Sequence, residues 1–327
     1  MKLELKDIKK SFGEKEILHG INFSVESGRA LGLLGRNGAG KTTTMRIIMD
    51  VFRANSGEVL LDGKKFIVDG SMVGYLPEER GLYPKRLIKT QMIYLAELRG
   101  MNKKQAAEST KKWLEKLHVL EYADRKLDTL SKGNQQKVQL AATLVGEPDI
   151  VILDEPFSGL DPVNAQILKD VINELIADGK IVIFSSHQMS YVEEFCEDIV
   201  IINHGDVVLS GNLNDIKVEY GRGRKIVNST NYSLSELADK FNKEFADMLK
   251  VLNVDKKYVI VDINEGVDQW TLLEAMKEKG IELNTYGAYE PSLNDIFVSK
   301  VGEEEAIVPA EEKEEETDKK KKGLFRK

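Results

Sequence analysis

The stretch Gly35-Arg36-Asn37-Gly38-Ala39-Gly40-Lys41-Thr42 decides the fold. It follows the continuous apolar run Ala30–Leu34 and precedes a helical pattern, as the phosphate-binding loop pattern G-x-x-x-x-G-K-[ST] requires. Its glycines let successive backbone N–H groups point into one concavity, and the N-terminus of the helix adds partial positive charge. Lys41 can then reach terminal phosphates, and Thr42 can offer its hydroxyl to Mg²⁺. The stretch therefore predicts a nucleotide phosphate site between a strand and a helix.

A second motif, Ile150-Val-Ile-Leu-Asp154-Glu155-Pro156, places two carboxylates at the end of a buried strand. Ligands bind at the C-terminal edge of a parallel sheet, so both side chains are expected beside the phosphate site. Asp154 can hold Mg²⁺ through water, and Glu155 can polarise the attacking water as general base. The pair alone could simply be a solvated turn, but its combination with the first motif favours phosphoryl transfer.

The pattern of apolar residues predicts an α/β core. Ala30–Leu34, Ile150–Leu153 and Ile181–Phe184 are continuous apolar runs, typical of strands buried on both faces of a parallel sheet. At the start of the chain Leu3, Leu5 and Ile8 alternate with charged residues, and 57–62 repeats the alternation. We expect the first of these to be an edge strand of an antiparallel layer.

Further along the chain the pattern predicts a helical insertion and a second domain. Between 85 and 145 strand signals give way to helical spacing. The polar break Arg222-Gly223-Arg224 separates a first domain, 1–215, from a small α+β domain at 225–300. From 303 to 327 Glu and Lys dominate, and so little apolar surface predicts a disordered tail.

Composition narrows the function classes. The chain has 327 residues, of which 42% are hydrophobic and 31% charged, enough for a folded core. Its apolar runs fall far short of the roughly 20 residues that cross a bilayer, and residues 1–10 do not resemble a secretory signal. A net charge of −7 does not favour nucleic acid as a partner. The single cysteine, Cys196, has apolar neighbours and is expected to be a buried thiol.

A third motif, Leu130-Ser131-Lys132-Gly133-Asn134-Gln135-Gln136, comes shortly before the Asp-Glu strand. With it, the chain resembles the ATP-binding cassette (ABC) ATPases, a family with a P-loop NTPase fold that uses ATP and Mg²⁺. In the family this signature loop completes the nucleotide site of the opposite subunit. The resemblance implies that Ser131, Lys132, Gly133 and Asn134 face ATP held by a second cassette, in a homodimer or a pair of different cassettes. Lys132 and Asn134 stand where Gly and Gln are commonest.

The resemblance also implies roles for residues outside the three motifs. Phe12 occupies the place of an aromatic that stacks on adenine, and Asp161 lies in a loop that communicates across the dimer. His187 corresponds to the switch histidine that contacts the γ-phosphate, and Glu78 stands where the family has a Gln that contacts Mg²⁺. The implied metal ligands are Thr42, Glu78 and Asp154, and the implied catalytic residues are Glu155 and His187. The implied nucleotide-binding residues are Phe12, Gly35, Asn37, Gly38, Ala39, Gly40, Lys41, Thr42 and Thr43.

The function implied is that of the ATP-binding and ATP-hydrolysing subunit of an ABC transporter, driving a separate integral membrane permease. Such a subunit is cytoplasmic and lies on the inner face of the membrane through its permease. Residues 225–300 resemble the C-terminal extension of bacterial sodium and drug efflux ATPases, which favours export. One alternative is a soluble ABC ATPase of DNA repair or the ribosome, although the chain lacks their usual coiled coils, zinc sites or second cassette. Another is a regulatory nucleotide-binding module, which Glu155 and His187 disfavour.

Overall fold

The computed structural model describes residues 1–68, 70, 72–79, 81–186 and 188–307, the last five as backbone only. The described residues divide into two compact units, 1–213 with 300–307, and Asn214–Ser299. The second unit thus begins before the polar break at 222–224. Of the predicted tail, residues 303–307 continue the last helix, and 308–327 lie outside the described residues.

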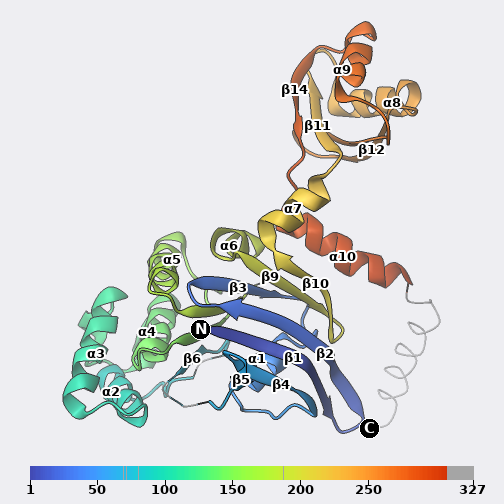
Figure 1. The fold of residues 1–327 in the computed structure, drawn as a ribbon. Coiled ribbons are helices and arrows are strands. Elements are labelled where there is room, and N and C mark those ends of the chain that lie inside the picture. Colours follow the sequence, from blue (N-terminus) through green and yellow to red (C-terminus); the bar gives the residue numbers. More distant parts are fainter. Residues whose placement is uncertain (69, 71, 80, 187, 308–327) are drawn as a thin grey trace, which may run out of the picture. The chain divides into compact units, whose positions relative to one another are not determined.

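A six-stranded sheet forms the centre of the first unit (Figure 1). Its strands, in spatial order, are β10 (Asp206–Asn212), β9 (Asp198–Asn203), β3 (Arg29–Leu34), β8 (Ile181–Ser185), β7 (Ile150–Asp154) and β6 (Val73–Leu76). All neighbours are parallel except β10 with β9. Helix α1 (Lys41–Ile48) follows β3, α5 (Pro162–Ala177) follows β7 and α6 (Met189–Phe195) follows β8. The three continuous apolar runs are therefore central parallel strands, as predicted.

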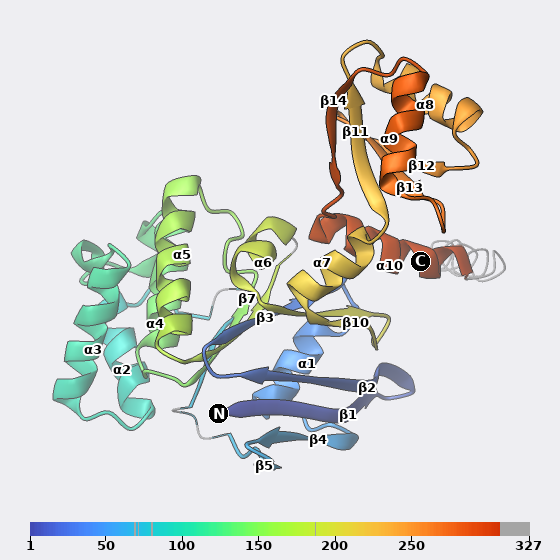
Figure 2. The same cartoon turned by 45° about the horizontal axis from the view of Figure 1, so that its top comes forward.

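An antiparallel sheet of β2 (Lys15–Glu26), β1 (Lys2–Phe12), β4 (Ser56–Leu61) and β5 (Lys64–Lys65), in that order, forms a second layer (Figure 2). The prediction that the first strand lies at an edge is wrong, because β1 pairs with β2 on one side and β4 on the other. The alternation of apolar and charged residues shows only that one face of β1 is buried. Edge strands and interior strands of an antiparallel sheet share this property. Leu3, Leu5 and Ile8 point into the main core between the two sheets.

The predicted helical insertion consists of α2 (Ile88–Leu98), α3 (Lys103–Lys116) and α4 (Lys132–Leu144). Two short 3₁₀ turns, Leu120–Tyr122 and Leu127–Thr129, connect α3 to α4. A capping box between Asn102 and Gln105 begins α3, since each side chain bonds the backbone of the other residue.

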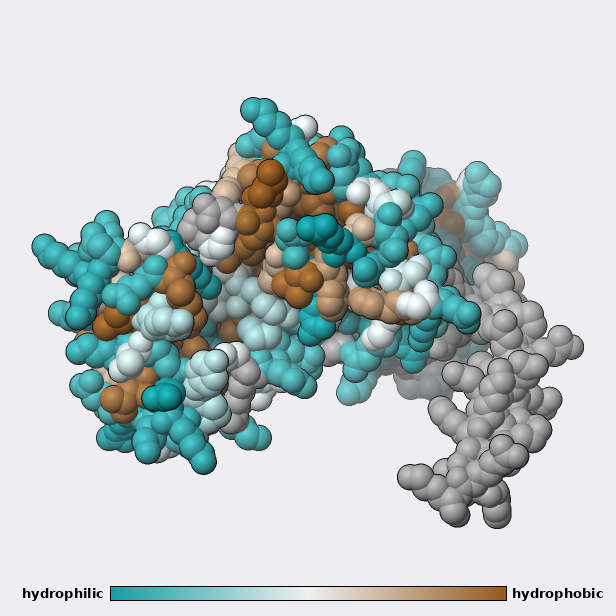
Figure 3. All heavy atoms as spheres, turned by 90° about the horizontal axis from the view of Figure 1, so that it is seen from below, coloured by the Kyte–Doolittle hydropathy of each residue, from teal (hydrophilic) through white to brown (hydrophobic). Residues whose placement is uncertain are grey.

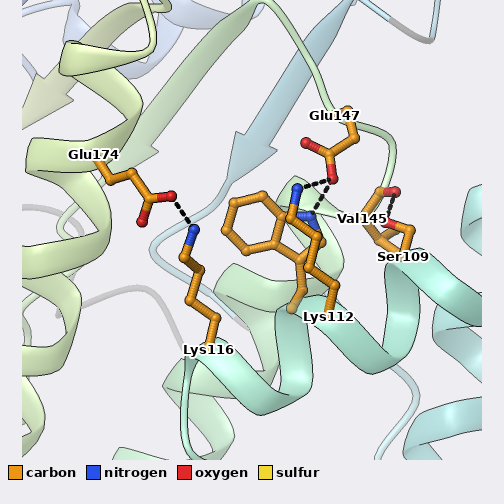
Figure 4. A network of polar contacts seen from close by, with 7 residues as sticks. Ser109, Lys112, Lys116, Val145, Glu147 and Glu174 are labelled. Carbon is orange, nitrogen blue, oxygen red and sulfur yellow. Dashed lines mark hydrogen bonds and ion pairs between the residues drawn. The ribbon is translucent and has the colours of Figure 1, made fainter.

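Polar contacts fasten α3 to the rest of the first unit (Figure 4). The Glu147 carboxylate accepts hydrogen bonds from the Lys112 ammonium at 2.8 Å and from the Trp113 indole N–H at 3.0 Å. The Ser109 hydroxyl donates to the Val145 carbonyl at 2.7 Å, and Lys116 pairs with Glu174 of α5. The insertion is thus bonded to the segment that leads into β7 and to a helix of the core.

The second unit is a four-stranded antiparallel sheet with helices. Its strands, in spatial order, are β12 (Leu249–Val254), β13 (Val259–Ile263), β11 (Arg224–Ser229) and β14 (Leu283–Ala288). Helices α8 (Leu234–Glu244) and α9 (Gln269–Glu278) connect them in a split β-α-β arrangement. Phe241 and Phe245 lie in its own core. Along the chain, α7 (Leu213–Gly221) precedes β11 and α10 (Leu293–Ile307) follows β14, and residues 300–307 of α10 belong to the first unit.

Candidate functional site

The loop between β3 and α1 requires glycine at several positions. Gly38 and Gly40 have φ angles of 83° and 115°, a region that side chains with a Cβ rarely adopt. A Cβ on Gly35 would lie 2.2 Å from the Ile202 carbonyl oxygen, and one on Gly40 would lie 2.5 Å from Leu18. Gly40 is also the residue before the first turn of α1. The loop therefore packs tightly on the core and leads directly into a helix N-terminus, a geometry suited to an anion.

Lys41, the first residue of α1, is folded against this loop. Its ammonium donates to the Gly35 carbonyl at 2.7 Å and to the Arg36 carbonyl at 3.1 Å. Burial lowers the pKa of Lys41, while the Glu155, Asp154 and Glu78 carboxylates oppose the shift. The ammonium thus lies in a partly desolvated position with carboxylates around it, where a polyphosphate would gain strongly from its charge.

Asp154 ends β7 and is held by hydroxyl groups. The Ser185 hydroxyl donates to Asp154 Oδ1 at 2.6 Å, since Asp154 and Ser185 are directly paired at the ends of neighbouring parallel strands. The Tyr75 hydroxyl approaches Asp154 Oδ2 at 3.4 Å. Burial, together with the Asp154 charge, raises the pKa of Tyr75 to about 12, so the phenol keeps its proton as a donor. These contacts fix the orientation of the carboxylate.

Glu155 lies on a strained turn directly after β7. Its φ angle is 50°, in the left-handed region that costs a side chain such as Glu roughly 1 kcal/mol or more. The Glu155 N–H donates to the Ser185 carbonyl at 3.2 Å, which holds the turn against β8. Strain of this kind concentrates at functional sites, and here it places a largely buried carboxylate beside Asp154.

These residues border one hollow of about 530 Å³. Its lining consists of Phe12, Lys15, Ile17, Asn37, Gly38, Gly40, Lys41, Thr42, Thr43, Glu78, Asp154 and Glu155. Phe12 is 44% exposed, which leaves its ring accessible to a flat partner, and it contacts Phe52 edge to face. Gly35 and Ala39 are buried residues of the loop and are not among those that line the hollow. The hollow therefore brings together an aromatic ring, two lysines, the phosphate loop and three carboxylates.

The 131–134 loop and Asp161 border other parts of the first unit. Ser131 caps α4, since its hydroxyl accepts from the Asn134 N–H, and a Cβ on Gly133 would lie 2.8 Å from the Asn164 amide nitrogen. Asp161 caps α5 by accepting from the Val163 and Asn164 N–H groups at 3.0 Å. Hydrogen bonds from the backbone and side chain of Asn164 lower the pKa of Asp161. None of these residues is among those that line the hollow of their own chain in its described part.

Comparison with known proteins decides the family. Residues 18–158 match the family model "ABC transporter", and residues 211–301 match "ATP-binding protein DrrA1-3-like, C-terminal domain". The uncharacterized ABC transporter ATP-binding protein YhaQ of Bacillus subtilis (strain 168) is 38% identical over 301 residues, covering 92% of this chain and 98% of YhaQ. The chain belongs to the ABC transporter ATP-binding proteins.

Two further matches agree with this membership. The linearmycin resistance ATP-binding protein LnrL of Bacillus subtilis (strain 168) is 29% identical to this ABC ATPase, with 92% of this chain and 98% of LnrL covered. A solved structure of the ATP-binding subunit of an ABC transporter superposes with a TM-score of 0.63 at 28% identity, covering 74% of this chain and all of that one. The chain is accordingly an ATP-binding, ATP-hydrolysing subunit of a transporter system.

The structure brings together most residues expected in the ABC nucleotide site, with some additions. His187 lies outside the described residues. Tyr75, Ser185, Lys15 and Ile17 were not expected in the site. Ser185 could have been found, because it ends the apolar run 181–184 just as Asp154 ends 150–153.

Cys196 is buried, as expected, and burial raises the pKa of its thiol. Its sulfur lies beneath Gly32 of β3, where a Cβ would approach it to 3.3 Å. The thiol therefore belongs to the packing of the core.

Proposed function

We propose that this subunit works in a pair of cassettes that closes around two ATP molecules and drives a separate integral membrane permease. The observation that carries the proposal is the hollow that joins Lys41, Asp154 and Glu155 at the C-terminal ends of parallel strands. In this account Lys41 and the loop 35–43 hold the phosphates, and Phe12 stacks on the adenine. Ser131, Lys132, Gly133 and Asn134 of one cassette complete the site of the other, and Asp161 communicates between them.

Glu155 is the proposed general base. Its carboxylate accepts the proton of the water that attacks the γ-phosphate, and the turn at φ 50° holds it on the phosphate side of β7. His187 is the proposed γ-phosphate contact.

Mg²⁺ fits the oxygen donors at the edge of the hollow. Among the described residues, there is no group of three or more His, Cys, Asp or Glu side chains that could hold a metal ion. This suits Mg²⁺, which takes one or two carboxylates and completes its shell with substrate phosphates and water. Thr42, Glu78 and Asp154 are the proposed ligands, and the ion would neutralise charge on the phosphates. Asp154 is oriented for this role by Ser185.

The permease is proposed to dock on the helical insertion. Leu87, Tyr94 and Leu98 are exposed and follow one stripe of α2, and Tyr83 in the preceding loop is 74% exposed. Figure 3 shows apolar residues on the lobe at the left, where the helical insertion lies. Within the described part of the chain, no helix is long and apolar enough to cross a bilayer. A membrane-embedded partner would cover the exposed stripe and provide the path for the substrate.

Export is the proposed direction. It is supported by the match of residues 211–301 to the DrrA1-3-like C-terminal domain and by the similarity to a linearmycin resistance protein along nearly the full chain. The same two matches favour a transporter over a soluble ATPase of DNA repair or the ribosome.

Glu155→Gln tests the catalytic assignment. We expect ATP binding to be retained and turnover to fall by about 10²-fold or more, because the amide cannot accept the water proton. Glu79→Gln is the matched control, since Glu79 is exposed and lies outside the lining of the hollow. Phosphate release by the purified chain measures the effect. Hydrolysis by Glu155→Gln at the wild-type rate would remove the assignment.

The permease is tested by purifying tagged Glu155→Gln with Mg-ATP from detergent-solubilised membranes. Mass spectrometry is expected to find a polytopic membrane protein in stoichiometric amount. Ribosomal or DNA-processing proteins in its place would favour the soluble alternative.

A further inference from the structure

A second hollow, of about 820 Å³, is lined only by residues of the second unit. α7, the turn 222–223, the start of β11 and the end of β14 border it. Its volume falls within the range of roughly 300–1,000 Å³ that is usual for small-molecule sites. None of its lining residues also lines the nucleotide hollow. The second hollow is therefore a candidate site that ATP binding does not explain.

Contacts within the second unit hold the walls of this second hollow in place. β11 pairs with β14, and the Tyr289 N–H donates to the Arg224 carbonyl at 3.1 Å next to this pairing. A Cβ on Gly221, the last residue of α7, would lie 2.4 Å from the Tyr289 carbonyl oxygen, so the helix end packs directly on this backbone. The Ile263 N–H donates to the Gly223 carbonyl at 3.1 Å. The fold itself thus shapes the second hollow.

Tyr289 provides an anchored aromatic ring in the lining. The residue is half-buried, and its hydroxyl donates to the Asp295 carboxylate at 3.1 Å. The same carboxylate oxygen accepts from the Ser292 N–H at 3.1 Å. Burial, together with the Asp295 charge, raises the pKa of Tyr289 to about 12, so the phenol keeps its proton and its hydrogen bond. A ring held at its hydroxyl end can stack on a flat group with little loss of entropy.

Basic side chains outnumber acidic ones around the second hollow. Its four basic residues are Lys217, Arg222, Arg224 and Lys225, and its three acidic residues are Asp215, Glu219 and Glu290. Lys217 pairs with Glu290 at 3.8 Å. Within the described part of the chain, no ion pair joins Arg222, Arg224 or Lys225 to a carboxylate. Arg224 and Lys225 are also half-buried, so an oxyanion would gain strongly from their charges.

We propose that the second hollow binds a small organic phosphate that carries a flat ring. Arg224 and Lys225 hold the phosphate, and the ring stacks on Tyr289. A phosphate monoester has about 1.5 to 2 negative charges at pH 7, so it gains more from neighbouring cations than a carboxylate with one charge. The proposal is independent of the proposed function, because the second hollow shares no lining residue with the nucleotide hollow.

Amide chemical shifts in NMR spectra of the full chain test the site, with phenyl phosphate as the probe. Binding in the second hollow is expected to shift the amides of 221–225 and 288–290, whereas binding at the phosphate loop would shift those of 35–43. We expect phenyl phosphate to bind about fivefold more tightly than inorganic phosphate, which has no ring, and than benzoate, which has a single charge. Shifts confined to 35–43, or equal affinity for the three probes, would overturn the proposal.

Substitutions assign the groups that hold the probe. Arg224→Met and Lys225→Met are each expected to weaken phenyl phosphate binding about fivefold or more, since each removes a charged donor. Lys250→Met is the matched control, because Lys250 is an exposed strand lysine of the same unit outside the lining, and its affinity should equal that of wild type. Tyr289→Leu should abolish the preference for phenyl phosphate over inorganic phosphate. Wild-type affinity in both Arg224→Met and Lys225→Met would contradict the site.

Vesicles distinguish a free phosphate from a lipid headgroup. Flotation of the full chain with phosphatidylglycerol vesicles is expected to be the same for wild type and Lys225→Met, because the proposed ligand needs a flat ring. Flotation that Lys225→Met abolishes, in a chain whose 221–225 amides do not respond to phenyl phosphate, would overturn the small-molecule proposal in favour of a headgroup.

Discussion

At the scale of single residues, the site depends on groups that orient the carboxylates as well as on the carboxylates themselves. Ser185 is fully buried, donates to Asp154 at 2.6 Å, and its carbonyl accepts from the Glu155 N–H. One serine therefore contacts both residues of the Asp-Glu pair. Ser185 ends β8, so the sheet fixes its backbone. The Ser185 hydroxyl can therefore orient the Asp154 carboxylate before any ligand binds.

Ser185→Ala is expected to lower the free energy of unfolding by about 1.5–3 kcal/mol, the cost of removing a hydrogen bond to a buried charged group. Urea denaturation followed by circular dichroism measures this. Ser186→Ala, which removes only the neutral contact to the Gln188 N–H, is the control and is expected to cost less. An equal loss of unfolding free energy in both variants would show that the hydrogen bond from Ser185 to Asp154 adds no special stability.

At the scale of elements, the C-terminal end of α4 contacts a half-buried cation, Arg99. The Arg99 guanidinium donates to the Ala142 and Thr143 carbonyls at 3.2 and 2.8 Å, at the C-terminal end of α4, where the helix dipole favours positive charge. Burial lowers the pKa of Arg99, although a guanidinium stays charged. Arg99 thereby joins the end of α2 to the end of α4.

Arg99→Met is expected to lower the free energy of unfolding by about 2 kcal/mol, because the last carbonyls of α4 lose charged donors. Arg53→Met, a substitution of an exposed arginine, is expected to change it by less than about 0.5 kcal/mol. Chemical denaturation of both variants measures the difference. Equal stability of the two would contradict a capping role for Arg99.

The sequence predicts the elements to different extents. The central strands could be predicted because burial on both faces leaves an uninterrupted apolar run, and the phosphate loop because only glycine fits its backbone. The interior position of β1 could not, because alternation does not reveal how many neighbours a strand has. Tyr75 was missed because β6 is short and its contact with Asp154 depends on tertiary structure. The second unit begins at Asn214, before the polar break, because α7 continues the chain without a compositional change.

At the scale of the whole molecule, each of the two units has a core of its own. The second unit packs α8 and α9 on its sheet around Phe241, which is fully buried. The hollow with Lys41 and Glu155 is built from residues of the first unit alone. Stability of the second unit and ATP hydrolysis by the first are therefore expected to be separable.

Phe241→Ala is expected to destabilise the second unit by about 3–5 kcal/mol, the usual cost of truncating a buried Phe. Hydrogen exchange should show lost protection in 214–299, while ATP hydrolysis by the isolated chain stays within about twofold of wild type, a small change in barrier. A large loss of hydrolysis with an intact first unit would show that the two units depend on each other.

The central claim is that two cassettes pair around ATP, and the mass of Glu155→Gln in solution tests it most directly. Size exclusion with light scattering is expected to show a single chain without nucleotide and twice that mass with Mg-ATP. Ser131→Arg in the same background should bind ATP and remain single, because the arginine would obstruct the loop that we propose to meet the second site. A Glu155→Gln chain that binds ATP and yet stays single at every protein concentration would contradict the account.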